Sequence, residues 1–289
     1  MEIIIGKTSG FCFGVKNAVD KATEELTKSK EPVYCLGELV HNKQVTNSLQ
    51  EKGLIFIDNI DEANGKTIVR AHGIKKDIYE KAKNLKIELK DLTCPKVLKI
   101  HDVVEEYSNN GYYIFLVGIP GHPETIGTHS FCGENSSIIE DVSDLEEKVC
   151  IFKKTNLKKA LLITQTTFSL IKFEEISERL KILLEDDELK VINSICPSTE
   201  QRQKETEKLS KEVDLMIIVG GRNSSNTKKL YDISSKNCNN VIFAETKDDI
   251  DINFIKQFEK IGVMAGASTP RESIDDIVKL IKEEDFCNA

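Results

Sequence analysis

The sequence has 289 residues, 39% of them hydrophobic, and a formal net charge of −8. A chain of this length can bury a substantial core, and its acidic balance argues against a broad nucleic-acid-binding surface, which needs clustered Lys and Arg. Because no stretch of about 18 consecutive apolar residues and no signal-peptide pattern is present, we expect a cytoplasmic protein without a membrane-spanning segment.

One plan of strand, loop and helix occurs three times along the chain. Each copy begins with a cysteine between a strand-like run and a helical pattern, in the segments TSGFCFGVKNAVDKA, KDLTCPKVLKIHDVV and NSICPSTEQRQKETE. In two copies a proline follows the cysteine, and proline is favoured at the first position of a helix. The pattern therefore predicts that Cys12, Cys94 and Cys196 are equivalent residues, each at the start of a helix.

Two further strand, loop and helix units follow the cysteine in each copy. Both loops carry a polar residue at nearly the same spacing from the cysteine. These residues are His41, His122 and Ser224 in the first loop, and His72, Thr166 and Ser268 in the second. A repeat of polar positions, and not only of apolar ones, indicates that the loops share a function.

Strands that alternate with helices predict parallel sheets whose two faces are both covered. We expect an α/β fold of three pseudo-symmetric modules, residues 1–92, 93–194 and 195–289. Ligand sites in such sheets form beyond the carboxyl ends of the strands, so modules whose strand ends face a common centre would surround one cavity. The alternative is three independently packed modules with ordinary loops, and the repeated polar positions favour the shared cavity.

The chain has eight cysteines and no C-x-x-C pair. Thiols stay reduced in the cytoplasm, so core residues, nucleophiles or metal ligands are favoured over disulfides. A helix N-terminus lowers the pKa of a thiol, which makes the three repeated cysteines the best candidates for metal-binding thiolates. Four others are interpreted as small buried hydrophobic residues: Cys35, Cys132, Cys150 and Cys238. Cys287 is interpreted as part of a frayed terminus.

Three thiolates leave one coordination position open, which is typical of a catalytic metal. Zinc fits such a site, and so does a cubic iron–sulfur cluster with one iron left for substrate. The spacing does not choose between them. The remaining loops offer hydrogen-bond donors and a carboxylic acid, but no hydrolytic pair around a metal-bound water.

The segment GGRNSSN, residues 220–226, follows an apolar run and opens a helix. Its backbone N–H groups and hydroxyls suit a phosphate oxygen, although a serine-capped turn explains the same residues. Three of the five histidines, His41, His72 and His122, lie in equivalent loops and could donate to the same anion together with Ser268. His101 and His129 have no counterparts in the repeat and are interpreted as surface residues.

Glu124 follows His122 and Pro123 at a predicted helix start. An acidic residue there is favourable through the helix dipole alone. The functional alternative is a proton source beside the open iron.

Taken together, the motifs resemble those of the 4-hydroxy-3-methylbut-2-enyl diphosphate reductase family. They are SGFCFGV, GELVHN, RAHG, LTCP, GHPE, TQTT, GGRNSSN and AGAST, and they extend in this order from the first residues to about residue 282. The resemblance implies a trefoil of three modules around a central [4Fe–4S] cluster, with Cys12, Cys94 and Cys196 as its ligands.

The resemblance also implies the activity, which is reductive removal of the C4 hydroxyl from (E)-4-hydroxy-3-methylbut-2-enyl diphosphate to give isopentenyl and dimethylallyl diphosphate. Carried over by motif position, Glu124 would be the proton donor, and Thr166 would orient the hydroxyl and relay the proton. The residues expected to hold the diphosphate are His41, His72, His122, Ser224, Ser225, Asn226 and Ser268. The family expectation for the electron donor is ferredoxin or flavodoxin. Some members continue into an RNA-binding repeat region, whereas this sequence stops at Ala289, and we expect no nucleic acid to bind this segment.

Two other interpretations remain. The first is a different triple-module iron–sulfur enzyme such as quinolinate synthase, which the TQTT, GHPE and SSN loops do not favour. The second is a non-catalytic protein that binds a phosphate ligand and has a structural zinc site with three cysteines.

Overall fold

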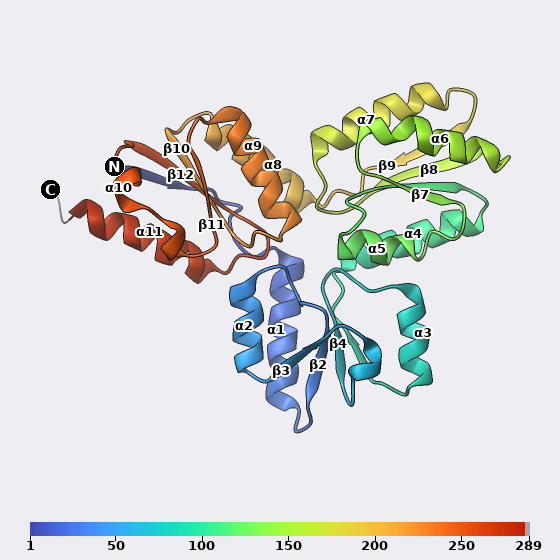
Figure 1. Ribbon diagram of the computed structural model, residues 1–289, viewed down its shortest axis with the longest axis horizontal. Coiled ribbons are helices and arrows are strands. Elements are labelled where there is room, and N and C mark those ends of the chain that lie inside the picture. The colour runs from blue at the N-terminus through green and yellow to red at the C-terminus, as the bar shows by residue number, and fades with distance from the viewer. Residues whose placement is uncertain (287–289) are drawn as a thin grey trace. The chain divides into compact units, whose positions relative to one another are not determined.

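The computed structural model describes residues 1–286, which form three parallel sheets of four strands each (Figure 1). The predicted α/β class with three parallel sheets is confirmed. The described chain divides into two compact units. The first combines Met1–Lys16, Val40–Leu49 and the described residues from Pro197 onward, and the second combines Asn17–Leu39 and Gln50–Cys196. Within residues 1–286, no helix is long and apolar enough to cross a bilayer.

The sheet of the first unit has its strands in the order β1 (Glu2–Ile5), β12 (Lys260–Ala265), β10 (Leu215–Val219) and β11 (Val241–Ala244). Its helices are α8 (Pro197–Ser210), α9 (Ser225–Asn237), α10 (Ile252–Ile255) and α11 (Arg271–Phe286), with η3 (Lys247–Asp249). Alternate residues of a strand point to opposite faces of a sheet. Ile217 and Val263 therefore pack with the isoleucines of α11, while Met216 packs on the other face, towards Leu209 of α8 and Leu230 of α9.

The second unit contains two sheets. In one the order is β3 (Leu54–Ile57), β2 (Val33–Leu36), β4 (Thr67–Val69) and β5 (Leu89–Asp91), and in the other it is β7 (Ser136–Ile139), β6 (Tyr113–Val117), β8 (Lys159–Thr164) and β9 (Glu188–Ile192). The helices are α3 (Lys76–Asn84), α4 (Pro95–Asn109), α5 (Pro123–His129), α6 (Leu145–Lys154) and α7 (Leu170–Leu183), with η1 (Ile60–Glu62) and η2 (Val142–Asp144). The helices α1 (Phe13–Lys28) and α2 (Lys43–Glu51) have residues in both units.

The strands β6 and β8 are apolar along almost their whole length because both of their faces are covered. Phe115 and Leu162 pack with Phe152 of α6 and with α7, whereas Ile114 and Leu161 pack on the opposite face with α4. This packing holds the carboxyl ends of β6 and β8, and the loops that follow them, in fixed positions.

Each of the three repeated cysteines follows an edge strand. The strands β5 and β9 are the last in their own sheets, and β1 pairs in parallel with β12, which lies near the other end of the sequence. The predicted module ranges 1–92, 93–194 and 195–289 stay a prediction. To them the pairing adds that β1 belongs to the sheet formed by residues 215–265.

Candidate active site

The three repeated cysteines lie at helix starts, as the sequence predicted. The carbonyl of Cys12 accepts the N–H of Lys16 in the first turn of α1, and Cys94 is the N-cap of α4. Cys196 directly precedes Pro197, the first residue of α8. All three cysteines are half-buried.

A backbone hydrogen bond links each of these cysteines to a loop that follows a strand. The N–H of Cys12 donates to the carbonyl of Ala267 at 3.1 Å, that of Cys94 to Ala71 at 3.0 Å, and that of Cys196 to Thr166 at 3.0 Å. The first pair lies in the first unit and the other two pairs lie in the second. The repeat is therefore present in the backbone as well as in the sequence.

The other cysteines divide into two groups. Cys35, Cys132 and Cys238 are buried, as predicted, and burial raises the pKa of the Cys35 and Cys132 thiols to about 12. The prediction for Cys150 was wrong, because this residue is exposed on α6. The buried residues of α6, Leu145, Val149 and Phe152, recur at helical spacing, and Cys150 lies off that stripe. Cys287 lies outside the described residues.

The loops after β2, β6 and β10 each end in a side-chain cap on the next helix. His122 Nδ1 accepts the N–H of Glu124 at 3.1 Å, and Ser224 Oγ accepts that of Thr227 at 3.3 Å. In the remaining copy the cap is Asn42, whose Oδ1 accepts the N–H of Gln44 at 3.0 Å. Asn42 is therefore the counterpart of His122 and Ser224. The sequence alignment placed His41 there, one residue too early.

The same comparison corrects the second set of loops. If the residues that accept the cysteine N–H groups are equivalent, then Thr166 corresponds to Ala71 and Ala267. His72 and Ser268 then correspond to Thr167. Spacing alone missed this shift because the loops of the three copies differ in length.

Glu124 and Thr166 form a buried pair in the second unit. The N–H of Thr166 donates to Glu124 Oε1 at 2.6 Å, and a hydrogen bond of 2.7 Å joins Thr166 Oγ1 to Glu124 Oε2. Glu124 is 1% exposed, and burial raises the pKa of its carboxyl to about 7, although the two hydrogen bonds oppose this shift. Desolvation favours the neutral form of a carboxylic acid. The pair can therefore hold and release a proton near neutral pH.

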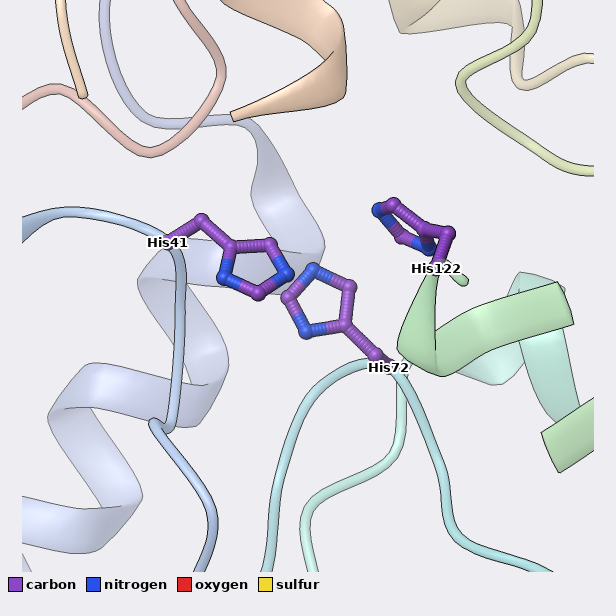
Figure 2. Close-up of side chains that lie close together, drawn as sticks. All are labelled: His41, His72 and His122. Carbon is purple, nitrogen blue, oxygen red and sulfur yellow. The ribbon is translucent and has the colours of Figure 1, made fainter. Parts of the chain in front are cut away.

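The three repeat histidines are drawn in Figure 2. His72 and His122 belong to the second unit, where their rings meet edge to face with centroids 5.3 Å apart. His41 belongs to the first unit, where its carbonyl accepts the hydroxyl of Ser268 at 3.1 Å. A β-carbon on Gly221 would lie only 2.7 Å from the same carbonyl, so the His41 loop packs closely on the GGRNSSN loop.

The start of α9 is buried together with its polar side chains. Ser224 caps the helix, and Ser225 and Asn226 form its first two positions, all three with little exposure. The amide oxygen and nitrogen of Asn226 have no hydrogen-bond partner among the described residues. A buried polar group without a partner is costly, so an unsatisfied amide in this loop indicates a place for a polar ligand.

His101 is not the surface residue that the sequence suggested. It is buried on α4, where its ring stacks on Phe131 with centroids 4.4 Å apart and lies against Gly73. Burial lowers its pKa to about 4. His129 is half-buried, and burial lowers its pKa as well. Neither position has a counterpart in the repeat, which is why spacing carried no information about either.

The sequence matches the profile described as LytB protein over residues 3–282. The chain belongs to the LytB family. A relative from Caldanaerobacter subterraneus subsp. tengcongensis, named 4-hydroxy-3-methylbut-2-enyl diphosphate reductase, is 40% identical over 98% of this chain and 97% of its own length. The resemblance inferred from the motifs is thus confirmed.

Two solved structures are similar to this LytB-family chain. The E-1-hydroxy-2-methyl-but-2-enyl-4-diphosphate reductase from Plasmodium falciparum has a TM-score of 0.89 and 33% identity, covering 96% of this chain and 87% of that one. The second is described as (E)-4-hydroxy-3-methyl-but-2-enyl diphosphate reductase, the terminal enzyme of the non-mevalonate pathway. It has a TM-score of 0.71 and 35% identity, covering 98% of this chain and all of that one.

Two polar residues of this LytB-family chain were not singled out by sequence reasoning. Asn42 was overlooked because the neighbouring His41 was matched with His122 and Ser224 by its spacing from the cysteine. Gln165 lies inside the TQTT motif and is almost completely buried, but received no role. A glutamine between two threonines at a strand end, where burial is expected, is the signal that could have identified it.

Proposed function

We propose that this chain catalyses the reductive removal of the C4 hydroxyl from (E)-4-hydroxy-3-methylbut-2-enyl diphosphate, giving isopentenyl and dimethylallyl diphosphate. Family membership supports the reaction, and the relatives described above bear the name of that enzyme. The observation that carries the proposal is the buried Glu124–Thr166 pair, because protonation of a leaving hydroxyl needs an acid that is neutral near pH 7.

Cys12, Cys94 and Cys196 are the residues that would hold a [4Fe–4S] cluster. Their support is the shared position at a helix start, the shared backbone bond to a strand-end loop, and their partial exposure. Thiolates are the usual protein ligands of such clusters. When bound, the cluster supplies single electrons and one open iron for a substrate oxygen.

The diphosphate is the proposed ligand of the polar loops. In the first unit these are the His41 loop, Ser268, and the start of α9 with Ser224, Ser225 and Asn226. The unsatisfied amide of Asn226 can donate to a phosphate oxygen, and backbone N–H groups at a helix N-terminus favour an anion. His72 and His122 are proposed diphosphate ligands as well. The N–H groups of the imidazoles serve here in place of Lys and Arg.

Glu124 and Thr166 are proposed to deliver the proton. The reaction consumes two electrons and two protons: the C–O bond breaks, the oxygen leaves as water, and a C–H bond forms. In the structure the Thr166 hydroxyl donates to Glu124 Oε2. When Glu124 is protonated this bond reverses, so that Glu124 donates to Thr166 Oγ1 and the hydroxyl proton of the threonine passes to the substrate oxygen. Because both residues are buried, bulk water cannot exchange protons with the pair during the transfer.

A cytoplasmic location and a small electron-transfer protein of the ferredoxin or flavodoxin type complete the proposal. A cluster that accepts single electrons needs a donor that releases them singly. The acidic composition supports the expectation that this segment binds no nucleic acid.

The cluster assignment is tested by replacing each of the eight cysteines with Ser and measuring iron after anaerobic reconstitution. Loss of iron in the Cys12, Cys94 and Cys196 variants, with retention in the Cys35 and Cys132 variants, is expected. The opposite pattern, or a colourless protein with stoichiometric zinc, contradicts the assignment and supports a structural zinc site.

The acid is tested by Glu124→Gln in the cluster-loaded enzyme. Turnover should fall by about 10²–10⁴-fold, the usual contribution of a positioned acid, while iron content and diphosphate binding persist. Near-normal turnover would show that Glu124 is not the proton donor. Its only contribution would then be the favourable interaction of an acidic residue with the N-terminus of α5.

A further inference from the structure

Gln165 connects the two loops that bring Glu124 and Thr166 together. Its side chain is 2% exposed. Gln165 Oε1 accepts the N–H of Ile119 at 3.1 Å and the hydroxyl of Thr125 at 3.2 Å. Gln165 Nε2 donates to Thr167 Oγ1 at 2.9 Å. One buried amide thus makes three side-chain hydrogen bonds within the second unit.

The partners of Gln165 lie on both sides of the acid. Ile119 is near the beginning of the loop that leaves β6, and Thr125 directly follows Glu124 on α5. Thr167 directly follows Thr166. The backbone of Gln165 is fixed as well, since its N–H donates to the carbonyl of Val117 at 2.7 Å. The loop with the acid therefore cannot move away from the loop with the threonine without breaking bonds to this amide.

Gly118 has no side chain, and this leaves space for Gln165 and Thr125 to approach each other. A β-carbon on Gly118 would lie 2.7 Å from Thr125 Oγ1 and 3.2 Å from the Gln165 β-carbon. The counterparts of Gly118 in the other copies are Gly37 and Gly220, whose N–H groups make the equivalent backbone bonds. A β-carbon would also meet a side chain at these glycines, that of Arg70 at Gly37 and that of Thr227 at Gly220, so lack of space recurs while the contacting residue differs.

The amide itself is not common to the three copies. The residues before Ala71 and Ala267, which correspond to Gln165, are Arg70 and Gly266. The fold therefore accepts a long cation or no side chain at this position. The buried glutamine occurs only in the copy that has Glu124 at its helix start. This indicates that the glutamine is needed for the acid, and not for the fold.

We propose that Gln165 is a positioning residue, which holds Glu124 against Thr166 in the geometry that proton delivery needs. This inference rests on the proposed function. Proton transfer requires heavy atoms within about 2.6–3.2 Å, and a displacement of about 1 Å can cost a hundredfold in rate. A neutral amide suits the task because it accepts two bonds, donates a third and adds no charge beside a buried carboxyl.

The test compares Gln165→Met with Gln165→Glu in the cluster-loaded enzyme. Methionine keeps the length of the side chain but makes none of the three bonds. We expect iron content and binding of inorganic diphosphate to persist, kcat to fall about 10- to 100-fold, and KM to change little. Water that enters the loosened pair should lower the titration midpoint of Glu124, followed by its infrared carboxyl band, by about one pH unit.

Gln165→Glu separates position from charge. It keeps an acceptor for Ile119 and Thr125 but places a second carboxyl beside Thr125, the residue that follows Glu124. Since a nearby like charge disfavours ionisation, the Glu124 midpoint should rise by about one pH unit. The two variants thus shift the same band in opposite directions.

Tyr113→Phe is the matched control, because it removes a buried 2.6 Å hydrogen bond to Ser137 in the same sheet. It should lower the melting temperature without moving the Glu124 band. If both Gln165 variants behave like this control, the residue is only structural and the inference is overturned. If Glu124→Gln keeps its turnover, the proposed proton role fails, whereas the band shifts still decide whether Gln165 positions the carboxyl.

Discussion

Replacing Glu124 with glutamine should remove the pH dependence of stability that this residue imposes. The pKa of the carboxyl is about 7 in the folded protein, against 4.5 for an unperturbed glutamate. Below pH 4.5 both the folded and the unfolded states hold the proton, and Glu124 causes no loss. As the pH rises from 4.5 through 7, the unfolded state ionises first and the folded state loses stability.

The size of this loss follows from the shift of 7 − 4.5 = 2.5 pH units. At about 1.4 kcal/mol per unit, it approaches roughly 3 kcal/mol above pH 7. Glutamine has nearly the same shape, can still accept the N–H of Thr166, and carries no charge. The variant should therefore gain about 3 kcal/mol relative to the natural protein between pH 4 and pH 8.

Urea unfolding of both cluster-free proteins, followed by circular dichroism from pH 4 to 8, measures this difference. Glu205→Gln is a control of opposite sign, because bonds from Thr8 and the Lys7 N–H lower the pKa of Glu205. That variant should lose stability relative to the natural protein as the pH rises. If the free-energy curves of Glu124→Gln and the natural protein run parallel, the carboxyl is not desolvated and the reasoning fails.

Three further variants test other parts of the structure. In the natural protein the buried imidazole of His101 should lower the free energy of unfolding by about 3 kcal/mol as the pH falls from 6.5 to about 4. His101→Leu should remove this loss, as measured by urea unfolding. If the pH dependence of unfolding is the same in both proteins, His101 is not buried as a neutral ring. Asn226→Ala should weaken binding of inorganic diphosphate about 10- to 100-fold by calorimetry and raise the melting temperature of the ligand-free protein, since an unsatisfied amide is removed; unchanged binding would place the pocket elsewhere. Gly118→Ala should destabilise by about 1–3 kcal/mol because of its contact with Thr125, whereas Gly121→Ala, which meets nothing within 4 Å, should not.

The sequence predicted the parallel sheets, the helix starts at the cysteines and the family, because each depends on local patterns. Apolar runs between helices indicate strands, and a Cys-Pro pair indicates a helix start, without knowledge of the packing. Registration between the copies was less accurate. Loop length varies, so two residues were matched one position away from the structural equivalence. The side-chain cap of Asn42 corrects the match of His41, and the backbone bonds of the cysteine N–H groups correct that of Thr166.

Burial of single polar residues was the other limit. His101 shares the buried stripe of α4 with Ile100 and Val104, and Cys150 lies off the buried stripe of α6. Their predicted environments were wrong because each residue was judged by its type and its place in the repeat, and not by helical periodicity. Gln165 belongs to the TQTT motif, but its role depends on contacts with Ile119, Thr125 and Thr167. These contacts form only when two loops pack together. Such a network is a property of tertiary structure and leaves no periodic trace in the sequence.

The pairing of β1 with β12 has a consequence for how the protein emerges from the ribosome. Residues 2–5 are synthesised long before their partner strand, residues 260–265. The sheets of the second unit are made from neighbouring stretches of chain and can fold while synthesis continues. The strand before Cys12 must wait, because pairing so distant in sequence forms slowly. The loop that holds Cys12, whose N–H binds the carbonyl of Ala267, therefore takes its final shape only after residues 260–267 have been made.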